Sequence, residues 1–431
     1  MYPNLGFFLE KLLGHPVLPI FYVVQSFGFL MAVSFLFAAW VLSRELRRKE
    51  KQGWVRPVKK EVVVGAPASV SDLVWNGIIG FIIGFKLIGM IADSKTFLAD
   101  PQHYILSGEG NLIGGIVMGA ALMYWKFREK AKQKTTTPEK KTIELFPHQM
   151  VGDITIVAAI SGILGAKVFD SLEHWSDLIR DPISTLLSFS GLAFWGGLVF
   201  GFLGVAWFCR KNKISILHMA DAAAPALILA YGLGRIGCQV SGDGDWGVLN
   251  SAYITQSDGK VAAATPEEFN QVIENNHPYY AYAFSEFDEI PEKRFRAPGW
   301  IPVWLAAQSY PNNVNEDGVP LPGCEGKYCN VLPVPVFPTP VYETVVALFI
   351  FAFMMSRRKK INAPGIMFSL YLILSSAERF LIEMIRVNPP YNILGITLSQ
   401  AQIISIVLVF IGIIGMTYFP KIKSRTLGNS E

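Results

Sequence analysis

The sequence predicts an all-α polytopic membrane protein with about nine transmembrane helices and a small extracytoplasmic inserted domain. About half of the 431 residues are hydrophobic and only 17% are charged, which is too little charged surface for soluble domains of this length. Apolar windows of roughly 20 residues, long enough to cross a hydrocarbon core of about 30 Å, recur along the whole chain. The nine expected spans are 17–43, 72–92, 111–126, 150–170, 191–209, 218–237, 340–355, 363–385 and 398–419.

Basic clusters predict the orientation of these spans. They follow the first, third, fifth, seventh and ninth spans, whereas the alternate loops carry few Lys or Arg residues. Because Lys and Arg in short loops are retained on the cytoplasmic side, we expect the amino terminus outside and the carboxyl terminus inside. The same clusters account for the net charge of +4 and suit anionic lipid head groups, so we expect no nucleic-acid partner. The first span is too long for a signal-peptide core, and we expect it to be retained.

The stretch 249–337 differs in composition from the rest of the chain. It is acidic, aromatic and proline-rich, and it is longer than an ordinary loop. We expect a small extramembrane domain that caps the outer face or binds a partner. Cys324 and Cys329 lie in this stretch and predict a disulfide in an oxidising compartment. A metal site is the alternative, but no His or second Cys pair lies nearby.

An internal repeat relates the second and third spans to the fourth and fifth. Polar and glycine landmarks recur at one constant offset: Asp72, Gly84, Lys86, Asp100, Pro101, Leu106, Ser107 and Gly110 correspond to Asp153, Gly165, Lys167, Asp181, Pro182, Leu187, Ser188 and Gly191. One residue later in register, Gly114, Gly115 and Gly119 correspond to Gly196, Gly197 and Gly201. We therefore expect a duplicated helix pair, in which the glycines permit close helix contact.

These features divide the chain into five expected parts. Residues 1–71 hold the first transmembrane helix and a basic cytoplasmic loop, and residues 72–149 hold the duplicated helix pair. The membrane core is expected in two parts, 150–248 and 338–431, on either side of the inserted domain at 249–337.

The run "YGLGRIGCQVSGDGDWG" at 231–247 places an arginine near the outer end of the sixth span. The Arg235 guanidinium can hold a lipid phosphate through two parallel hydrogen bonds. The residues that follow allow the backbone to turn toward a ligand and supply two carboxylates: Gly242, Asp243, Gly244, Asp245 and Gly247. The alternative is an interfacial arginine that extends to water beside a glycine helix stop.

The run "AERFLIEMIR" in the eighth span holds a second group of charges. Arg379, Glu383 and Arg386 are spaced by four and three residues, so on a helix they fall on one face. Ionisable side chains inside a membrane cost several kcal/mol, which makes them functional candidates. Glu383 can pair with either arginine and leave the other free for an anion. A purely structural set of salt bridges is the alternative. Both runs approach the outer leaflet, which suggests a bound phosphate.

At these residues the sequence resembles the prolipoprotein diacylglyceryl transferases. The family's signature is Gly-Arg-x-Gly-Asn-Phe-x-Asn-x-Glu-x-x-Gly, and "GRIGCQVSGDGDWG" fits it in part. Gly234, Arg235 and Gly237 match the family's residues, and Asp243 stands where the family has a glutamate. Gly247 matches the last glycine if one residue is inserted before it, and Cys238 and Ser241 replace the two asparagines.

Further runs extend the resemblance. "DAAAPALILAYGLGRIG" is similar to the approach to the signature, "PTPVYE" resembles the family's Pro-x-x-x-Tyr-Glu, "RFLIEMIR" its Arg-Phe-x-x-Glu-x-x-Arg, and "LSQAQIIS" its terminal helix. The first span resembles the family's first helix, with Phe27 where a tyrosine is usual. Members of the family have seven transmembrane spans, so the nine spans expected here correspond to those seven and the duplicated pair. Trp195 stands where the family has a histidine, which is a candidate base for the substrate thiol.

The resemblance implies transfer of the diacylglyceryl group of phosphatidylglycerol to the lipobox cysteine of prolipoproteins, at the outer face of the bacterial inner membrane. The implied partners are phosphatidylglycerol, prolipoprotein signal peptides and membrane lipid, and no cofactor is expected. We expect catalytic roles for Arg235, Asp243, Arg379 and Glu383. Glu383, Asp243 and Asp245 are the candidates to replace the histidine, and Asp243 is the first choice because it stands where the family has an acidic residue. The alternative is that Arg235, Arg379 and Arg386 lower the pKa of the substrate thiol without a dedicated base. The expected substrate-binding residues are Arg235, Gly237, Gly247, Tyr342, Glu343 and Arg386.

Two other classes of function compete with transfer. The first is a catalytically inactive relative that binds phospholipid or regulates membrane processes, which the replaced asparagines, Trp195 and the inserted domain favour. The second is a transporter, which only the internal repeat supports. Its charged groups would lie at one leaflet and not at the midplane, which argues against transport.

Overall fold

The computed structural model describes residues 1–431 except 19, 65–66, 100–103, 105–106, 133–138, 183–192, 390, 394–395 and 429–431. Repeat positions 100, 101, 106, 187, 188 and 191 therefore lie outside the described residues. The chain forms two compact units. The first contains Met1–Phe7, Gln25–Arg56 and Phe146–Glu431, and the second contains Phe8–Val24 and Pro57–Leu145.

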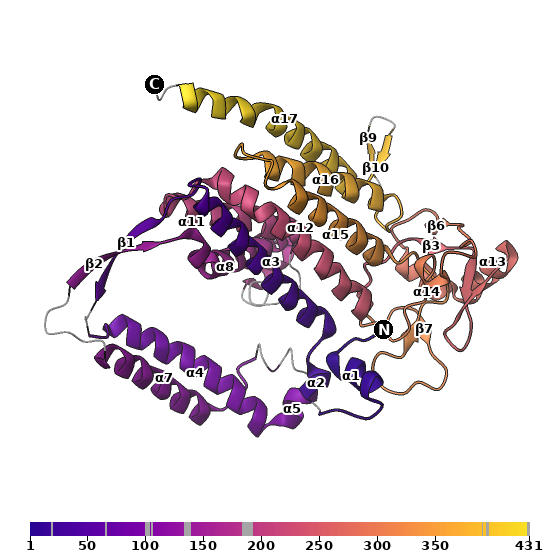
Figure 1. Ribbon diagram of the computed structural model, residues 1–431. Coiled ribbons are helices and arrows are strands. Elements are labelled where there is room, and N and C mark those ends of the chain that lie inside the picture. The colour runs from indigo at the N-terminus through magenta and orange to yellow at the C-terminus, as the bar shows by residue number, and fades with distance from the viewer. Residues whose placement is uncertain are drawn as a thin grey trace. The chain divides into compact units, whose positions relative to one another are not determined.

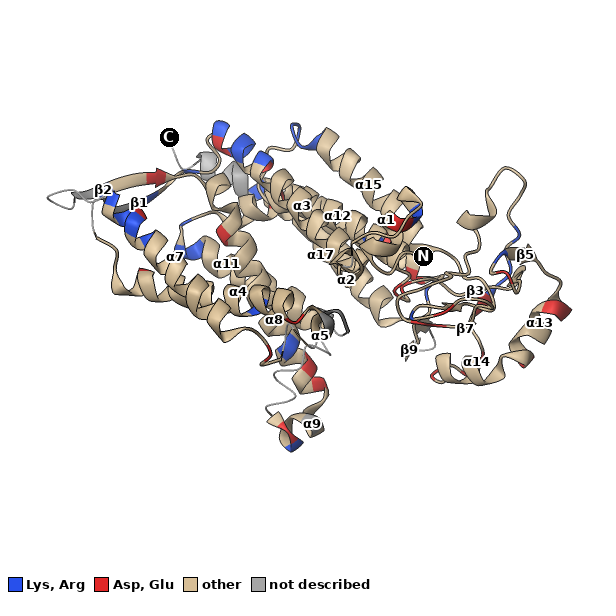
Figure 2. Ribbon diagram, turned by 90° about the horizontal axis from the view of Figure 1, so that it is seen from below, with Lys and Arg blue, Asp and Glu red and all other residues tan. Residues whose placement is uncertain are grey.

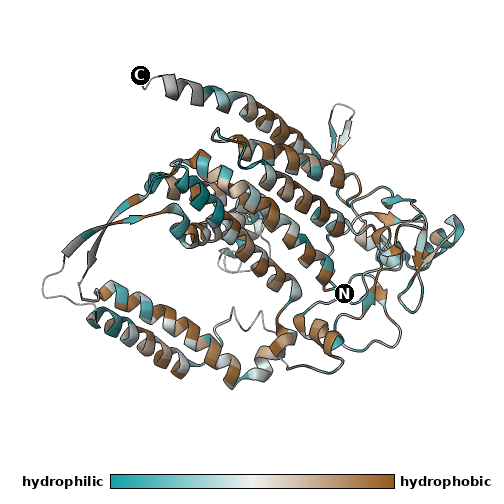
Figure 3. Cartoon of the chain, viewed as in Figure 1, coloured by the Kyte–Doolittle hydropathy of each residue, from teal (hydrophilic) through white to brown (hydrophobic). Residues whose placement is uncertain are grey.

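The first unit is a bundle of long apolar helices (Figures 1 and 3). They are α3 (Ser26–Lys51), α8 (Val151–Glu173), α11 (Phe194–Lys211), α12 (Ile216–Ser241), α15 (Thr339–Arg357), α16 (Ile366–Glu383) and α17 (Gln400–Gly428). Half of the most apolar stretch of α12 is buried, against less than a quarter of those of α3 and α17. Helix α12 contacts α3, α15 and α16, so it is the centre of this unit.

Small residues let the neighbours of α12 approach closely. Ala224 and Ile228 of α12 pack with Ala347, Ile350 and Met354 in one buried cluster. A Cβ added at Gly232 would lie 2.8 Å from the Cβ of Ala347, so the crossing of α12 and α15 requires a glycine there. This close crossing brings the carboxyl-terminal turns of α12 near the start of α15.

Among the residues that the structure describes, six helices are long and apolar enough to cross a membrane, which confirms a multi-pass membrane protein. They are α3, α4 (Val70–Ala92), α8 with its preceding turn, α12, α15 and α17. The other three expected spans form helices α7 (Leu112–Lys132), α11 and α16, which are not among these six. Helix α16 carries Glu378, Arg379 and Glu383, whose charges lower its mean hydropathy. The count of nine spans and their sidedness stay predictions.

Exposed side chains agree with a lipid environment. Large apolar residues project outward from the helices, among them Leu36 at 71%, Ile91 at 79% and Phe349 at 72% exposure. A soluble protein rarely exposes contiguous apolar surface on this scale. The first helix also differs from the expected span, because α3 begins at Ser26 and continues to Lys51. Its last residues include Lys and Arg, which are good helix formers and extend the helix past the apolar stretch.

Charged residues cluster at one end of the first unit's helices (Figure 2). The buried Lys49 near the end of α3 pairs with Asp221 near the start of α12 at 3.4 Å, and Glu45 pairs with Arg48 at 2.9 Å. Helix α12 has 26 residues and is therefore about 39 Å long. Arg235 lies toward the other end of α12 from this basic cluster.

The second unit contains a helix pair and a two-stranded ribbon. Helices α4 and α7 pack together, and strand β1 (Val58–Val64) pairs antiparallel with β2 (Glu139–Leu145). A Cβ at Gly84 would lie 2.3 Å from the Gly114 carbonyl oxygen. In the first unit, a Cβ at Gly165 would lie 2.4 Å from the carbonyl oxygen of Gly196. The two helix pairs thus cross at corresponding glycines of the repeat, and duplication remains our interpretation. The other helical elements that the structure describes outside the 249–337 segment are short: α1 (Leu5–Leu13), α2 (Ile20–Val23), α5 (Ser94–Ala99), α9 (Trp175–Arg180) and a 3₁₀ turn (Pro147–Met150) before α8.

The 249–337 segment belongs to the first unit and consists of short elements. They are β3 (Leu249–Asn250), β4 (Tyr253–Thr255), β5 (Val261–Ala263), α13 (Pro266–Asn275), α14 (His277–Ala283), β6 (Glu292–Lys293), a 3₁₀ turn (Val303–Leu305), β7 (Val319–Pro320) and β8 (Asn330–Val331). Strands β3 and β6 pair in parallel, and β4–β5 and β7–β8 are antiparallel. The chain is mostly helical, as expected, and this segment has only short runs of regular structure because it holds many prolines and turns.

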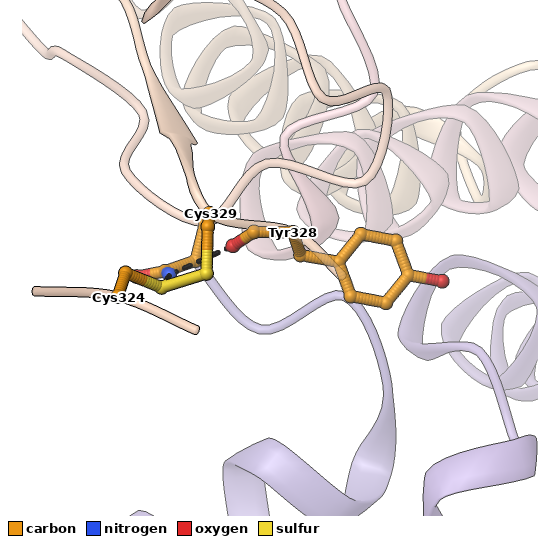
Figure 4. The surroundings of a disulfide bond; sticks show 4 residues. Cys324, Tyr328 and Cys329 are labelled. Carbon is orange, nitrogen blue, oxygen red and sulfur yellow. Dashed lines mark hydrogen bonds between the residues drawn. A yellow bond between two sulfur atoms is a disulfide. The ribbon is translucent and has the colours of Figure 1, made fainter. Parts of the chain in front are cut away.

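The segment has its own small core and its expected disulfide. Phe269, Tyr280 and Tyr310 are buried together with apolar residues of the last strand region. Cys324 and Cys329 form a disulfide, and the Tyr328 ring points away from it (Figure 4). The disulfide occupies both thiols and excludes the alternative of a metal site at these cysteines. One further hairpin, β9 (Tyr391–Ile393) with β10 (Ile396–Leu398), precedes α17.

Candidate active site

Four charged side chains from separate parts of the chain form a closed ring. Arg235 of α12 pairs with Asp245, in the turn after α12, and with Glu343 of α15. Arg386, just beyond α16, pairs with the same two acids, and its Nη1 lies 3.1 Å from Glu343 Oε1. Each arginine contacts both acids and each acid both arginines. We call these four residues the arginine–carboxylate ring.

Burial differs sharply among the members of the ring. The Glu343 side chain is 0% exposed, whereas that of Asp245 is 34% exposed. Burial opposes ionisation of Asp245, but the guanidinium groups of Arg235 and Arg386 outweigh it and hold the pKa of this carboxyl below its usual range. The ring is electrically neutral overall, as buried charges generally require. Asp245 is its most accessible acid.

The turn that carries Asp245 depends on glycine. Gly242 and Gly244 have φ values of 65° and 91°, in the left-handed region that favours glycine. At Gly247 a Cβ would lie 2.5 Å from the Ile385 carbonyl oxygen, so only glycine lets the turn pair with the backbone at Arg386. The neighbouring Val248 N–H donates to that same carbonyl at 2.8 Å. Gly247, expected to bind substrate, thus lies where it positions the ring.

A second layer of side chains supports Glu343. The Tyr231 hydroxyl donates to Glu343 Oε2 at 2.9 Å and lies 3.4 Å from Glu378 Oε1. The Arg235 guanidinium lies 5.2 Å from the centroid of the Tyr231 ring, within the range of a cation–π interaction. The sequence reasoning missed Tyr231 and Glu378. Both residues could have been identified from the sequence, because Tyr231 precedes Arg235 by one helical turn and Glu378 is an ionisable residue inside an apolar span.

Arg379 and Glu383 form a separate pair. Arg379 Nη2 lies 2.7 Å from Glu383 Oε2, and Glu383 Oε1 accepts hydrogen bonds from Asn388 at 2.6 Å and Ser399 at 2.8 Å. The expectation that Arg386 shares a helix face with these two residues is wrong, because α16 ends at Glu383. Arg386 is thereby free to join the ring.

Cys238 and Asp243 lie beside the ring. The Cys238 sulfur is 3.7 Å from Arg235 Nη1 and from Asp245 Oδ2. Burial raises the pKa of Asp243 above its usual range, in contrast to that of Asp245. Two neighbouring carboxyls whose pKa values are driven apart suit different chemical roles. Ligand atoms of Cys238, Asp243 and Asp245 lie within 4.8 Å of one another, but both guanidiniums already neutralise Asp245, and we continue to expect no metal.

Two expected site positions, Tyr342 and Gly237, contact residues outside the ring, and Trp195 replaces the family histidine. The Tyr342 hydroxyl donates to the Leu305 carbonyl, so this side chain faces the 249–337 segment. A Cβ at Gly237 would meet Phe27 at 3.4 Å, so this glycine packs against α3. Trp195 lies in the first turn of α11, and its indole is a donor that cannot act as a base.

The prolipoprotein diacylglyceryl transferase family model matches residues 112–418, more than half of the chain. The chain belongs to this family. The match begins at α7 and covers the last seven of the nine expected spans. The expected equivalence of the first span with the family's first helix lies outside the match and stays a prediction.

Several curated relatives carry the same name. A phosphatidylglycerol–prolipoprotein diacylglyceryl transferase 2 of Clostridium perfringens is 27% identical over 63% of this chain and 79% of its own length. The transferase of Staphylococcus xylosus is 24% identical over 70% of this chain and 83% of its own length. A Corynebacterium glutamicum transferase is 29% identical over 39% of this chain and 53% of its own length. The similarity to the first two relatives extends over most of their length.

Proposed function

We propose that this chain transfers the diacylglyceryl group of phosphatidylglycerol to the lipobox cysteine of prolipoproteins, at the outer face of a bacterial inner membrane. The observation that carries the proposal is the arginine–carboxylate ring, in which Arg235 and Arg386 share two acids near one end of α12. Family membership and the names of the relatives, which state both substrates, support it. Binding of the signal peptide that precedes the cysteine is part of the proposal.

The ring is suited to receive a phosphate. Arginine pairs with phosphate and with carboxylate through the same two parallel hydrogen bonds, so a phosphodiester can replace Asp245 between the two guanidiniums. Asp245 is the acid to be displaced because it lies in a turn and is partly exposed, whereas Glu343 is fully buried. Glu343 then keeps Arg235 and Arg386 in place, held in turn by Tyr231.

Bond formation and cleavage balance in one step. The substrate sulfur attacks the glyceryl carbon, a thioether forms, and the carbon–oxygen bond to phosphate breaks with its electron pair leaving on glycerol phosphate. Arg235 and Arg386 stabilise the charge that develops on the departing phosphate, which is the kind of preorganised electrostatic stabilisation that enzymes use most. Arg379, paired with Glu383, has an Nη1 that lacks a hydrogen-bond partner among the described residues. We assign this pair to supporting the same charge.

The thiol proton needs an acceptor, because a free cysteine near pKa 8.5 is only a few per cent ionised at neutral pH. Asp243 is the best candidate beside the ring. Burial raises its pKa, so it binds a proton more readily than Asp245, which two guanidiniums keep ionised. Trp195 occupies the position where the family has a histidine, so that base is absent from this position. The absence of this histidine favours a second candidate function, phospholipid binding without transfer. Membership of a family of transferases does not favour that candidate.

Rescue of lipoprotein maturation in a bacterium depleted of its own transferase tests the proposal. The intact chain should restore maturation, and Arg235→Ala should not, at matched membrane expression. Arg296→Ala is the matched control, because Arg296 is an exposed arginine of the 249–337 segment, and it should rescue like the intact chain. Correct insertion of the intact chain without rescue would overturn the proposal.

A further inference from the structure

A cavity of about 530 Å³ lies beside the ring. Its lining includes helix α14 with the residues that follow it, and Gly244, Trp246 and Gly247 of the turn. Arg386 belongs both to the cavity wall and to the ring. The cavity and the ring therefore adjoin at Arg386, and both lie within the first compact unit.

Aromatic side chains form much of the cavity wall. Tyr280 and Phe284 stack with ring centroids 6.2 Å apart, and Phe287 meets Phe284 edge-on at 6.1 Å. Trp246 packs on the buried Tyr310 at 4.8 Å. Rigid aromatic side chains provide large contact areas at a small cost in conformational entropy, and binding sites for polypeptides use them widely.

The charges in the wall disfavour a phosphate group. Besides Arg386 the charged lining residues are Glu286 and Asp317, both acidic. The two terminal nitrogens of Arg386 are already paired with Asp245 and Glu343. The carboxylates of Glu286 and Asp317 repel an anion and can accept hydrogen bonds from the N–H groups of a peptide backbone.

We propose that this cavity binds the first residues of the mature polypeptide, those that follow the modified cysteine. The inference rests on the proposed function. The apolar core of a signal peptide precedes the cysteine and lies in the membrane, so the following residues leave the ring on its aqueous side. The cavity volume lies within the range of about 300–1,000 Å³ that is usual for ligand sites. An extended peptide rises about 3.4 Å per residue, so only a few residues fit.

Substrate length tests the proposal. Two synthetic lipobox peptides would be identical through the cysteine, the short one ending one residue later and the long one four residues later. Ala283→Trp fills the cavity from an exposed position of α14, and Ala281→Trp, exposed on the same helix but outside the lining, is the matched control. With phosphatidylglycerol vesicles, Ala283→Trp should raise the KM for the long peptide at least fivefold. It should leave the KM for the short peptide within twofold, and Ala281→Trp should leave both unchanged.

Three results would overturn the proposal. The first is an unchanged KM for the long peptide in Ala283→Trp. The second is an equal effect of Ala281→Trp. The third is an increased KM for phosphatidylglycerol with both peptides, which would place the lipid head group in the cavity.

A crosslinking measurement separates failure of this proposal from failure of the proposed function. The long peptide, with serine in place of its cysteine and a photoreactive benzoylphenylalanine three residues later, cannot undergo transfer. It should crosslink to 279–287 in the intact chain and not in Ala283→Trp. If the intact chain transfers nothing yet crosslinks in this way, peptide binding stands and the transferase proposal falls. If no crosslink maps to 279–287, the cavity proposal is refuted whatever the activity.

Discussion

The closest backbone approach at the site lies at Gly247, and its substitution by alanine tests how the turn positions Arg386. The new Cβ would lie 2.5 Å from the Ile385 carbonyl oxygen, 2.9 Å from Thr339 Cγ2 and 3.0 Å from Phe337 Cβ. Ordinary contacts between heavy atoms are about 3.5 Å or longer, so the turn must move by about 1 Å. Such a shift breaks the 2.8 Å hydrogen bond from Val248 N–H to Ile385 and separates the ring.

The expected losses follow from these distances. Overpacking costs about 1–3 kcal/mol and the broken hydrogen bond about 1 kcal/mol, so Gly247→Ala should lower the free energy of unfolding by about 2–4 kcal/mol. A displacement of about 1 Å in a catalytic group can reduce the rate about 100-fold, and transfer should fall by at least tenfold. Thermal unfolding in detergent and transfer in vesicles measure the two effects.

Gly299→Ala is the matched control for this experiment. A Cβ at Gly299 meets nothing within 4 Å and its backbone does not require glycine, so this variant should behave like the intact chain. Wild-type activity and stability of Gly247→Ala would refute the argument that the turn must approach the backbone at Arg386.

Three further predictions follow from the site. Asp243→Asn should lower kcat at least tenfold without changing the KM for phosphatidylglycerol. Because burial raises the pKa of Asp243 and the active form is ionised, activity should fall as the pH falls through that raised pKa, and an unchanged pH profile in Asp243→Asn would contradict the assignment. Glu343→Gln leaves two arginines to share one acid and should destabilise the protein by about 3–5 kcal/mol in thermal unfolding, whereas the exposed Glu325→Gln should not. Replacement of Cys324 and Cys329 by serine opens a short loop and should lower the free energy of unfolding by about 2 kcal/mol. Proteolysis within the 249–337 segment should become faster, while transfer to the short peptide persists. Loss of that transfer would contradict a purely local role of the disulfide.

The ring also explains how a neutral resting site can bind an anion. Asp245 occupies both guanidiniums until a phosphate arrives, so the buried arginines are never left without a negative partner. The exchange requires only that the Asp245 side chain moves aside, because Glu343 is held from α15. Loss of Asp245 alone would therefore leave excess positive charge and favour any anion, including competing phosphate.

The sequence alone determined the membrane class, the family and the main charged residues of the site. Hydropathy and basic clusters are properties of consecutive residues, so they can be read without knowledge of contacts. Arg235, Arg386, Glu343 and Asp243 were found because charges in or next to apolar spans are costly and motif spacing is local. The disulfide between two nearby cysteines was predictable for the same reason.

Only the tertiary structure decided which charges pair. Arg386 was expected on one helix face with Glu383, but α16 ends at Glu383, and Arg386 pairs with Asp245 and Glu343 from distant parts of the chain. Gly247 was expected to bind substrate, which stays a prediction, and the structure adds that it permits a close backbone approach. Ion pairing and cavity shape depend on where helices cross and where turns dock. Those positions arise from contacts among residues far apart in sequence, and no local pattern encodes them.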